Sequence, residues 1–187
     1  MRPLFTINAG EFVVGDFIEK MYREKKYRLN VWHPSKDTGV DLLVTDGKNQ
    51  KTISLQVKLS HNFLATDMHA NHRKKLRAMS WFSLDRQKID NSKADYWVFV
   101  LVDFTGGSRD FVIIEPSQLL ARLDKIHNTW KITPSYLWVT KDNHCWETRG
   151  LKRREQEAIA QGEYADEVRD FSAYLNDWAP VRALNTR

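Results

Sequence analysis

Hydrophobic and polar positions recur with two different periods along the chain, and each change of period marks a new element. In residues 8–26 the apolar side chains recur every three or four positions, which predicts a helix that starts at Asn8 or Gly10. Residues 27–33 alternate with a period of two and are expected to form a strand. The polar segment 34–39 has the composition of a loop.

The next pattern predicts an antiparallel hairpin with polar side chains gathered on one face. Residues 40–45 and 52–59 are β-prone runs joined by a short polar turn that contains a glycine. Symmetric pairing across this turn sets Asp41 opposite Gln56, and Lys58, two residues further on, shares their face. The other face can pack as core; its residues are Val40, Leu42, Val44, Leu55 and Val57.

The remainder of the chain has strands and helices in turn. Residues 61–93 are polar and basic and are expected to be helical in part, whereas the apolar run 95–104 is typical of a buried central strand. A strand over 111–114, a helix over 118–126 and a short edge strand over 136–139 follow.

The C-terminal segment carries apolar residues at helical spacing. They are separated by four, three, four and three positions, and they are Tyr164, Val168, Phe171, Leu175 and Trp178. This stripe predicts one amphipathic C-terminal helix. The fold class expected from the whole pattern is α/β, with one mixed β-sheet, flanking helices, a core over residues 1–150 and a helical extension over 151–187 packed on it.

Composition and charge narrow the functional classes. The single cysteine, Cys145, excludes an internal disulfide or a cysteine-rich zinc site, and no run resembles a signal peptide or a membrane helix. We therefore expect a cytoplasmic protein with no membrane partner. The formal net charge of +5 and the sequence pI of about 9.3 favour a polyanionic partner such as nucleic acid.

The polar face of the hairpin has the chemistry of a metal and phosphate site. Asp41 offers a carboxylate, Gln56 and the backbone carbonyl of Val57 offer neutral oxygens, and Lys58 offers a cation for a phosphate under attack. Mg²⁺ takes such oxygen ligands. The alternative interpretation is an ordinary ion pair between Asp41 and Lys58, with Gln56 solvated.

The residues of this segment resemble the PD-(D/E)xK nuclease superfamily. The resemblance covers residues 10–59, namely Gly10-Glu11 at the start of a helix, then residues 39–44, then Leu55-Gln56-Val57-Lys58, and it is greatest to the Gln-x-Lys branch of Mrr-like nucleases. It implies a restriction-endonuclease-like fold in which Glu11, Asp41 and Gln56 hold Mg²⁺, or Mn²⁺ in its place, and Lys58 assists hydrolysis. Val40 stands where the family name has proline. Gln56 replaces the usual acid, so Glu11 has to supply the second carboxylate.

Several other residues carry competing interpretations. Glu11 can instead stabilise the helix dipole by roughly 0.3–1 kcal/mol, and Glu19 is the reserve acid. Asp37 can bind a second metal or cap a turn. The histidines His61, His69 and His72 include a candidate general base, and surface or phosphate-contacting groups are the preferred interpretation. Cys145 beside His144 has the residue types of a nucleophile pair, and a buried thiol is the preferred interpretation.

A basic segment is the expected contact with the nucleic-acid backbone. Its densest run contains Arg73, Lys74, Lys75 and Arg77, whose charges suit phosphates without reading sequence. Trp81-Phe82 can stack on bases or anchor the core. A second cluster, Arg149 and residues 152–154, is interpreted as a charged helix terminus in preference to a nucleic-acid contact.

The function expected from the sequence is a Mg²⁺-dependent endonuclease that acts on DNA rather than RNA, in a restriction or defence setting. Cleavage of both strands of a duplex implies a homodimer by analogy with the family. A junction-cutting or recombination nuclease, a catalytically inactive nucleic-acid-binding module on the same fold, and a protein-interaction domain remain as alternatives.

Overall fold

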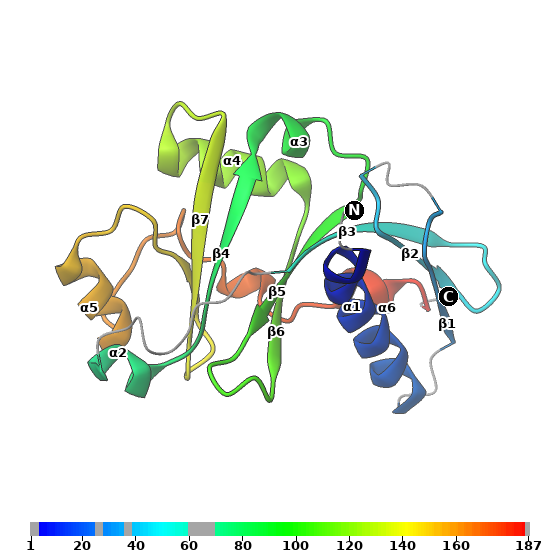
Figure 1. The fold of residues 1–187 in the computed structure, drawn as a ribbon, viewed down its shortest axis with the longest axis horizontal. Coiled ribbons are helices and arrows are strands. Elements are labelled where there is room, and N and C mark those ends of the chain that lie inside the picture. Colours follow the sequence, from blue (N-terminus) through cyan, green and yellow to red (C-terminus); the bar gives the residue numbers. More distant parts are fainter. Residues whose placement is uncertain (1–3, 25–27, 36–38, 60–69, 186–187) are drawn as a thin grey trace.

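The computed structural model describes residues 4–24, 28–35, 39–59 and 70–185 and contains two β-sheets with helices packed around them (Figure 1). The strands are β1 (Leu29–Trp32), β2 (Leu42–Asp46), β3 (Thr52–Leu59), β4 (Leu76–Asp85), β5 (Tyr96–Val102), β6 (Arg109–Ile114), β7 (Ile132–Thr140) and β8 (Cys145–Glu147). The helices are α1 (Leu4–Glu24), α2 (Ala70–Lys75), α3 (Arg86–Asp90), α4 (Pro116–His127), α5 (Arg153–Gln161), the 3₁₀ turn η2 (Ser172–Tyr174) and α6 (Ala179–Ala183). Within these ranges no helix has the length and apolarity needed to cross a bilayer.

The larger sheet is mixed and contains the predicted hairpin. Its strand order is β1-β2-β3-β5-β6, with β3 parallel to β5 and every other pair antiparallel. The predicted α/β class with a mixed sheet is therefore confirmed. The predicted register is confirmed too, because Leu42 pairs with Leu55 and the Asp46 amide donates to the Lys51 carbonyl at 3.1 Å.

The two faces of this sheet pack against different parts of the chain. Val14 and Ile18 of α1 cover one face together with α6, over strand residues such as Leu55 and Val98. The helix begins at Leu4, earlier than the predicted Asn8 or Gly10, because apolar and helix-compatible residues precede both. The other face, which includes Phe99, packs against the second sheet and α4 (Figure 1). Gln56 and Lys58 point toward this second face, since they alternate with the core residues of β3.

The prediction of one sheet is wrong. β4, β7 and β8 form a separate antiparallel sheet in that order, so the segment 136–139, expected at an edge, lies in its central strand. Residues 76–85, placed in a partly helical region, form the ten-residue strand β4. The basic run before β4 hid its alternation, in which Leu76, Ala78 and Phe82 are buried.

The predicted single C-terminal helix is also wrong. Helix α5 ends at Gln161, because its C-cap Gly162 has a positive φ of 77°. The chain then continues mainly through turns and isolated bridges. The apolar stripe reaches the core from this irregular path. Leu175 bridges Val112 of β6, and Trp178 precedes the short helix α6. Spacing of three and four is compatible with turns when each apolar residue meets a different part of the core.

One ion pair connects both sheets and the C-terminal segment. The guanidinium of Arg77 on β4 donates two hydrogen bonds of 2.8 Å to the carboxylate of Asp110 on β6. The side-chain amide of Asn176 donates to the same carboxylate at 2.8 Å, and its oxygen accepts from the Phe111 amide. A further bond runs from Arg77 to Asn143. We call this set the Arg77–Asp110 junction.

A second buried carboxylate lies in the smaller sheet. Glu147 on β8 is fully buried, and its Oε2 atom accepts from Arg169 at 2.9 Å, while its Oε1 atom accepts from the Tyr136 amide. Burial raises the pKa of Glu147 to about 7, although Arg169 and the backbone amides act in the opposite direction. Burial lowers the pKa of the neighbouring His127, whose Nε2 atom is 3.8 Å from Glu147.

Glu147→Gln is expected to remove part of the pH dependence of stability. The folded protein keeps a proton on Glu147 up to about pH 7, whereas the unfolded chain releases it near pH 4.5, so the free energy of unfolding falls as pH rises through this window. The fall is about 3 kcal/mol. Urea unfolding of the wild type and the variant across this pH range measures the difference. His127 is present in both proteins, so its own titration contributes to both profiles. Identical pH profiles would contradict the assignment.

Trp178→Ala tests whether the C-terminal segment belongs to the core. The indole of Trp178 is buried and lies 5.2 Å from the rings of both Phe17 and Phe111, centroid to centroid. Its removal is expected to lower the free energy of unfolding by about 3–5 kcal/mol, measured by urea unfolding. Trp32→Ala is the matched control, because the Trp32 side chain is half exposed. Equal losses from the two changes would contradict this packing.

Candidate functional site

The hairpin brings Asp41 and Gln56 into direct contact. The Oδ2 atom of Asp41 accepts a hydrogen bond from the Gln56 amide nitrogen and another, at 2.7 Å, from the backbone amide of Val57. Gln56 is only 9% exposed, and Asp41 is partly buried. The expected convergence of these two side chains is therefore present, and its geometry follows from the confirmed register.

The backbone of β3 places a carbonyl at the same edge. The Leu55 carbonyl accepts from the Asp41 amide at 2.8 Å, so the polar backbone groups of Leu55 point toward β2. Val57 lies two residues further along the strand, so its backbone N–H also points toward β2, where it donates to the Asp41 carboxylate. By strand alternation its carbonyl points to the β2 side as well, and its part in a metal site stays a prediction.

Lys58 lies over an aromatic ring that sequence reasoning did not assign to the site. Its Nζ atom is 5.3 Å from the centroid of the Trp97 ring on β5. The parallel register, which sets Gln56 beside Trp97 and Lys58 beside Phe99, produces this contact. An ammonium held over an indole is attracted by the ring quadrupole, which orients it. Only the long-range pairing of β3 with β5 reveals Trp97, so no local signal in the sequence could have found it.

Glu11 lies on α1, which covers the face of the sheet opposite to Gln56 and Lys58, and its Oε2 atom is 3.7 Å from Nδ1 of His33. A Cβ atom on its neighbour Gly10 would come within 3.0 Å of Leu59, so α1 contacts the end of β3 at this point. His33 follows Trp32, which pairs with Leu43, so it extends β1 toward Asp41. Sequence reasoning missed His33, because its partner lies on a helix more than twenty residues away.

The hairpin offers oxygen atoms of the kind that a hard divalent cation binds. The described residues contain no group of three His, Cys, Asp or Glu side chains that could hold an ion together. A site here would take the Asp41 carboxylate with the neutral oxygens of Gln56 and Val57, and the second carboxylate would have to come from Glu11, on the helix that covers the other face of the sheet. Such a set of oxygen ligands, completed by water and substrate phosphate, is the kind that Mg²⁺ accepts.

Other candidate residues are distributed elsewhere. Arg73, Lys74 and Lys75 lie on α2, and both lysine side chains are exposed. Arg77 is at the Arg77–Asp110 junction, where its guanidinium is engaged by a carboxylate. The segments with Asp37, His61 and His69 lie outside the described residues. Glu19 is exposed and pairs with Arg23 at 3.6 Å.

The remaining alternatives resolve toward packing. Cys145 is buried, and burial raises the pKa of its thiol, which disfavours a nucleophilic thiolate. Phe82 packs with Phe99 at 4.9 Å between ring centroids, so it anchors the core. These residues explain stability and carry no evident chemistry.

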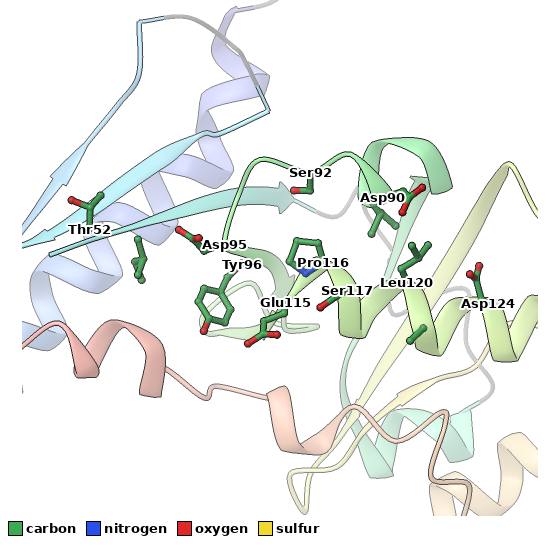
Figure 2. Close-up of a pocket in the computed structure, with 13 residues that line it drawn as sticks. Thr52, Asp90, Ser92, Asp95, Tyr96, Glu115, Pro116, Ser117, Leu120 and Asp124 are labelled. Carbon is green, nitrogen blue, oxygen red and sulfur yellow. The ribbon is translucent and has the colours of Figure 1, made fainter.

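The hollow drawn in Figure 2 lies at the other end of β3 and has a volume of about 800 Å³. Thr52 begins that strand, and the carboxylates of Asp90, Asp95 and Glu115 also line the hollow. A concentration of negative charge repels phosphate. A nucleic acid that reaches Asp41 is therefore not expected to pass through this hollow.

No protein-family model, curated protein or solved structure matches this chain.

Gly39→Ala tests how far the backbone before Asp41 depends on glycine. Gly39 has a φ of +87°, and a Cβ atom there would be 3.8 Å from the Gln56 side-chain oxygen, an ordinary contact. The strain of the positive φ alone is expected to lower the free energy of unfolding by about 1–2 kcal/mol in urea titrations. Gly106→Ala, at φ +72° with no atom nearby, is the matched control and should lose a similar amount. An unchanged stability for Gly39→Ala would refute this account.

Proposed function

We propose that this protein is a metal-dependent endonuclease that hydrolyses phosphodiester bonds in DNA. The observation that carries the proposal is the convergence of Asp41, Gln56 and Lys58 on one face of the β2–β3 hairpin. A carboxylate, a neutral oxygen and an oriented cation are together suited to binding a phosphate and a hard cation.

Each residue has a definable part in the hydrolysis. When bound, Mg²⁺ supplies Lewis-acid polarisation and a water of lowered pKa. Asp41 and Glu11 would hold it with their carboxylates, and Gln56 and the Val57 carbonyl would complete the protein ligands. Lys58 would donate hydrogen bonds to a phosphate oxygen, where negative charge increases as water attacks phosphorus and the leaving oxygen departs.

The Trp97 ring supports this role for Lys58. A flexible lysine loses conformational entropy when it is fixed in one position. Attraction to the indole, whose centroid is 5.3 Å from Nζ, offsets part of this entropy loss before substrate binds. The ammonium is thus positioned before substrate arrives, which favours catalysis by preorganised charge.

The biological setting and assembly rest on the resemblance in residues 10–59. We infer DNA rather than RNA as substrate, a restriction or defence role, and a homodimer with one site for each strand. The basic residues Lys74 and Lys75 would bind the backbone phosphates.

A second candidate is a nucleic-acid-binding module that does not cut. One observation favours it: the Asp41 Oδ2 atom already accepts hydrogen bonds from Gln56 and from the Val57 amide. A carboxylate satisfied in this way can serve structure alone.

Asp41→Asn and Lys58→Ala test the proposed chemistry. Each should reduce the nicking of supercoiled plasmid in Mg²⁺ or Mn²⁺ by at least ~100-fold, because one removes a ligand charge and the other a transition-state cation. Lys48→Ala, in the exposed hairpin turn, is the matched control and should cut as the wild type does. Circular dichroism melting checks that each variant folds.

Two outcomes would exclude the proposal in different ways. Undiminished nicking by both variants would show that the site is elsewhere. A folded wild type that binds DNA and fails to cut it in either metal would establish the binding module instead.

A further inference from the structure

The structure joins two basic segments that lie about eighty residues apart in the sequence. Helices α2 and α5 lie side by side at one edge of the molecule, beyond the smaller sheet (Figure 1). Between them is a hollow of about 330 Å³. Its lining residues are His72, Lys74, Lys75, Arg153, Glu157, Ala160 and Gln161. We call it the α2–α5 hollow.

The charge of the α2–α5 hollow is predominantly positive. Lys74, Lys75 and Arg153 oppose a single carboxylate, Glu157, which accepts from Arg153 at 2.9 Å. Lys141 adjoins the hollow, since its amide donates to the Lys75 carbonyl at 2.9 Å. Converging cations in a concave surface strengthen the local field for an anion. This hollow and the carboxylate-lined hollow of Figure 2 have opposite charge.

A buried histidine distinguishes this hollow from an ordinary solvated helix surface. His72 is 7% exposed, and its ring lies 5.5 Å from the Trp138 ring, centroid to centroid. Packing against Trp138 restricts the orientation of the imidazole at the wall of the hollow. The imidazole therefore lies beside any anion that the surrounding lysines attract into the hollow.

We propose that the α2–α5 hollow binds a backbone phosphate of nucleic acid. The identification of the ligand rests on the proposed function, whereas the binding of an anion follows from the hollow itself. Arg153, interpreted from the sequence as part of a charged helix terminus, becomes a ligand together with Lys74, Lys75 and His72. The contact carries no base information, so its effect is on affinity and placement for every sequence.

Fluorescence anisotropy with a labelled DNA duplex in EDTA tests this site without any cleavage. Lys74→Gln/Lys75→Gln should weaken binding roughly tenfold and reduce the slope of log affinity against log salt by about one, because one phosphate contact is lost. Lys88→Gln/Lys125→Gln removes the same charge from exposed positions elsewhere and should change affinity much less. Glu157→Gln should strengthen binding, since it frees Arg153. Equal losses in the two double variants would overturn the proposal.

Nuclear magnetic resonance of the histidine Cε1–H signals identifies the source of the phosphate. The His72 signal, assigned with His72→Gln, should shift with the duplex at concentrations where inorganic phosphate leaves it unmoved. A shift with inorganic phosphate and none with duplex would overturn the nucleic-acid ligand, as would a wild type that binds no duplex. Asp41→Asn should give the wild-type shift although its nicking is reduced by at least ~100-fold, so failure of the nuclease proposal is recognised separately.

Discussion

The parallel pairing of β3 with β5 is the constraint on which the rest of the molecule depends. It sets Gln56 beside Trp97 and Lys58 beside Phe99, which attaches the hairpin to the buried centre of the larger sheet. A parallel pair cannot be joined by a tight turn, so the chain has to travel a long way between the two strands. That crossover contains α2, β4 and α3. It therefore includes one wall of the α2–α5 hollow and the first strand of the second sheet.

The local parts of this arrangement could be read from the sequence. Alternation in 40–45 and 52–59, with a short turn between them, was sufficient to predict the contact between Asp41 and Gln56, because a hairpin register depends on adjacent residues. The positions of Trp97 and His33 were beyond such reasoning, since each depends on a partner distant in the chain. The strand β4 was not predicted for another reason. The basic residues of α2 directly precede it, and the whole segment was interpreted as polar and partly helical despite the alternation within β4. The apolar stripe of the C-terminal segment led to the wrong prediction of one helix, because turns are compatible with the same spacing of apolar residues.

Charge is distributed along the molecule more unevenly than the net value of +5 suggests. Carboxylates line the hollow beside α3 and α4, and lysines and an arginine line the one between α2 and α5. A polyanion in the field of this chain would be repelled from the first region and attracted to the second. Under the proposed function, a nucleic acid is therefore expected to avoid the end of β3 at which Thr52 lies.

The Arg77–Asp110 junction has a consequence for geometry as well as for stability. It connects β4, which follows α2 and the α2–α5 hollow, with β6 in the sheet that contains the hairpin. Asn176 donates a hydrogen bond to the same carboxylate. Two parts of a protein connected by a bidentate pair with well-formed hydrogen bonds do not easily slide past one another. The distance between the α2–α5 hollow, where the nucleic-acid backbone would be held, and the hairpin, where it would be cut, is then fixed by the fold. Scission at a fixed number of nucleotides from the contact, whatever the base sequence, would follow from that rigidity.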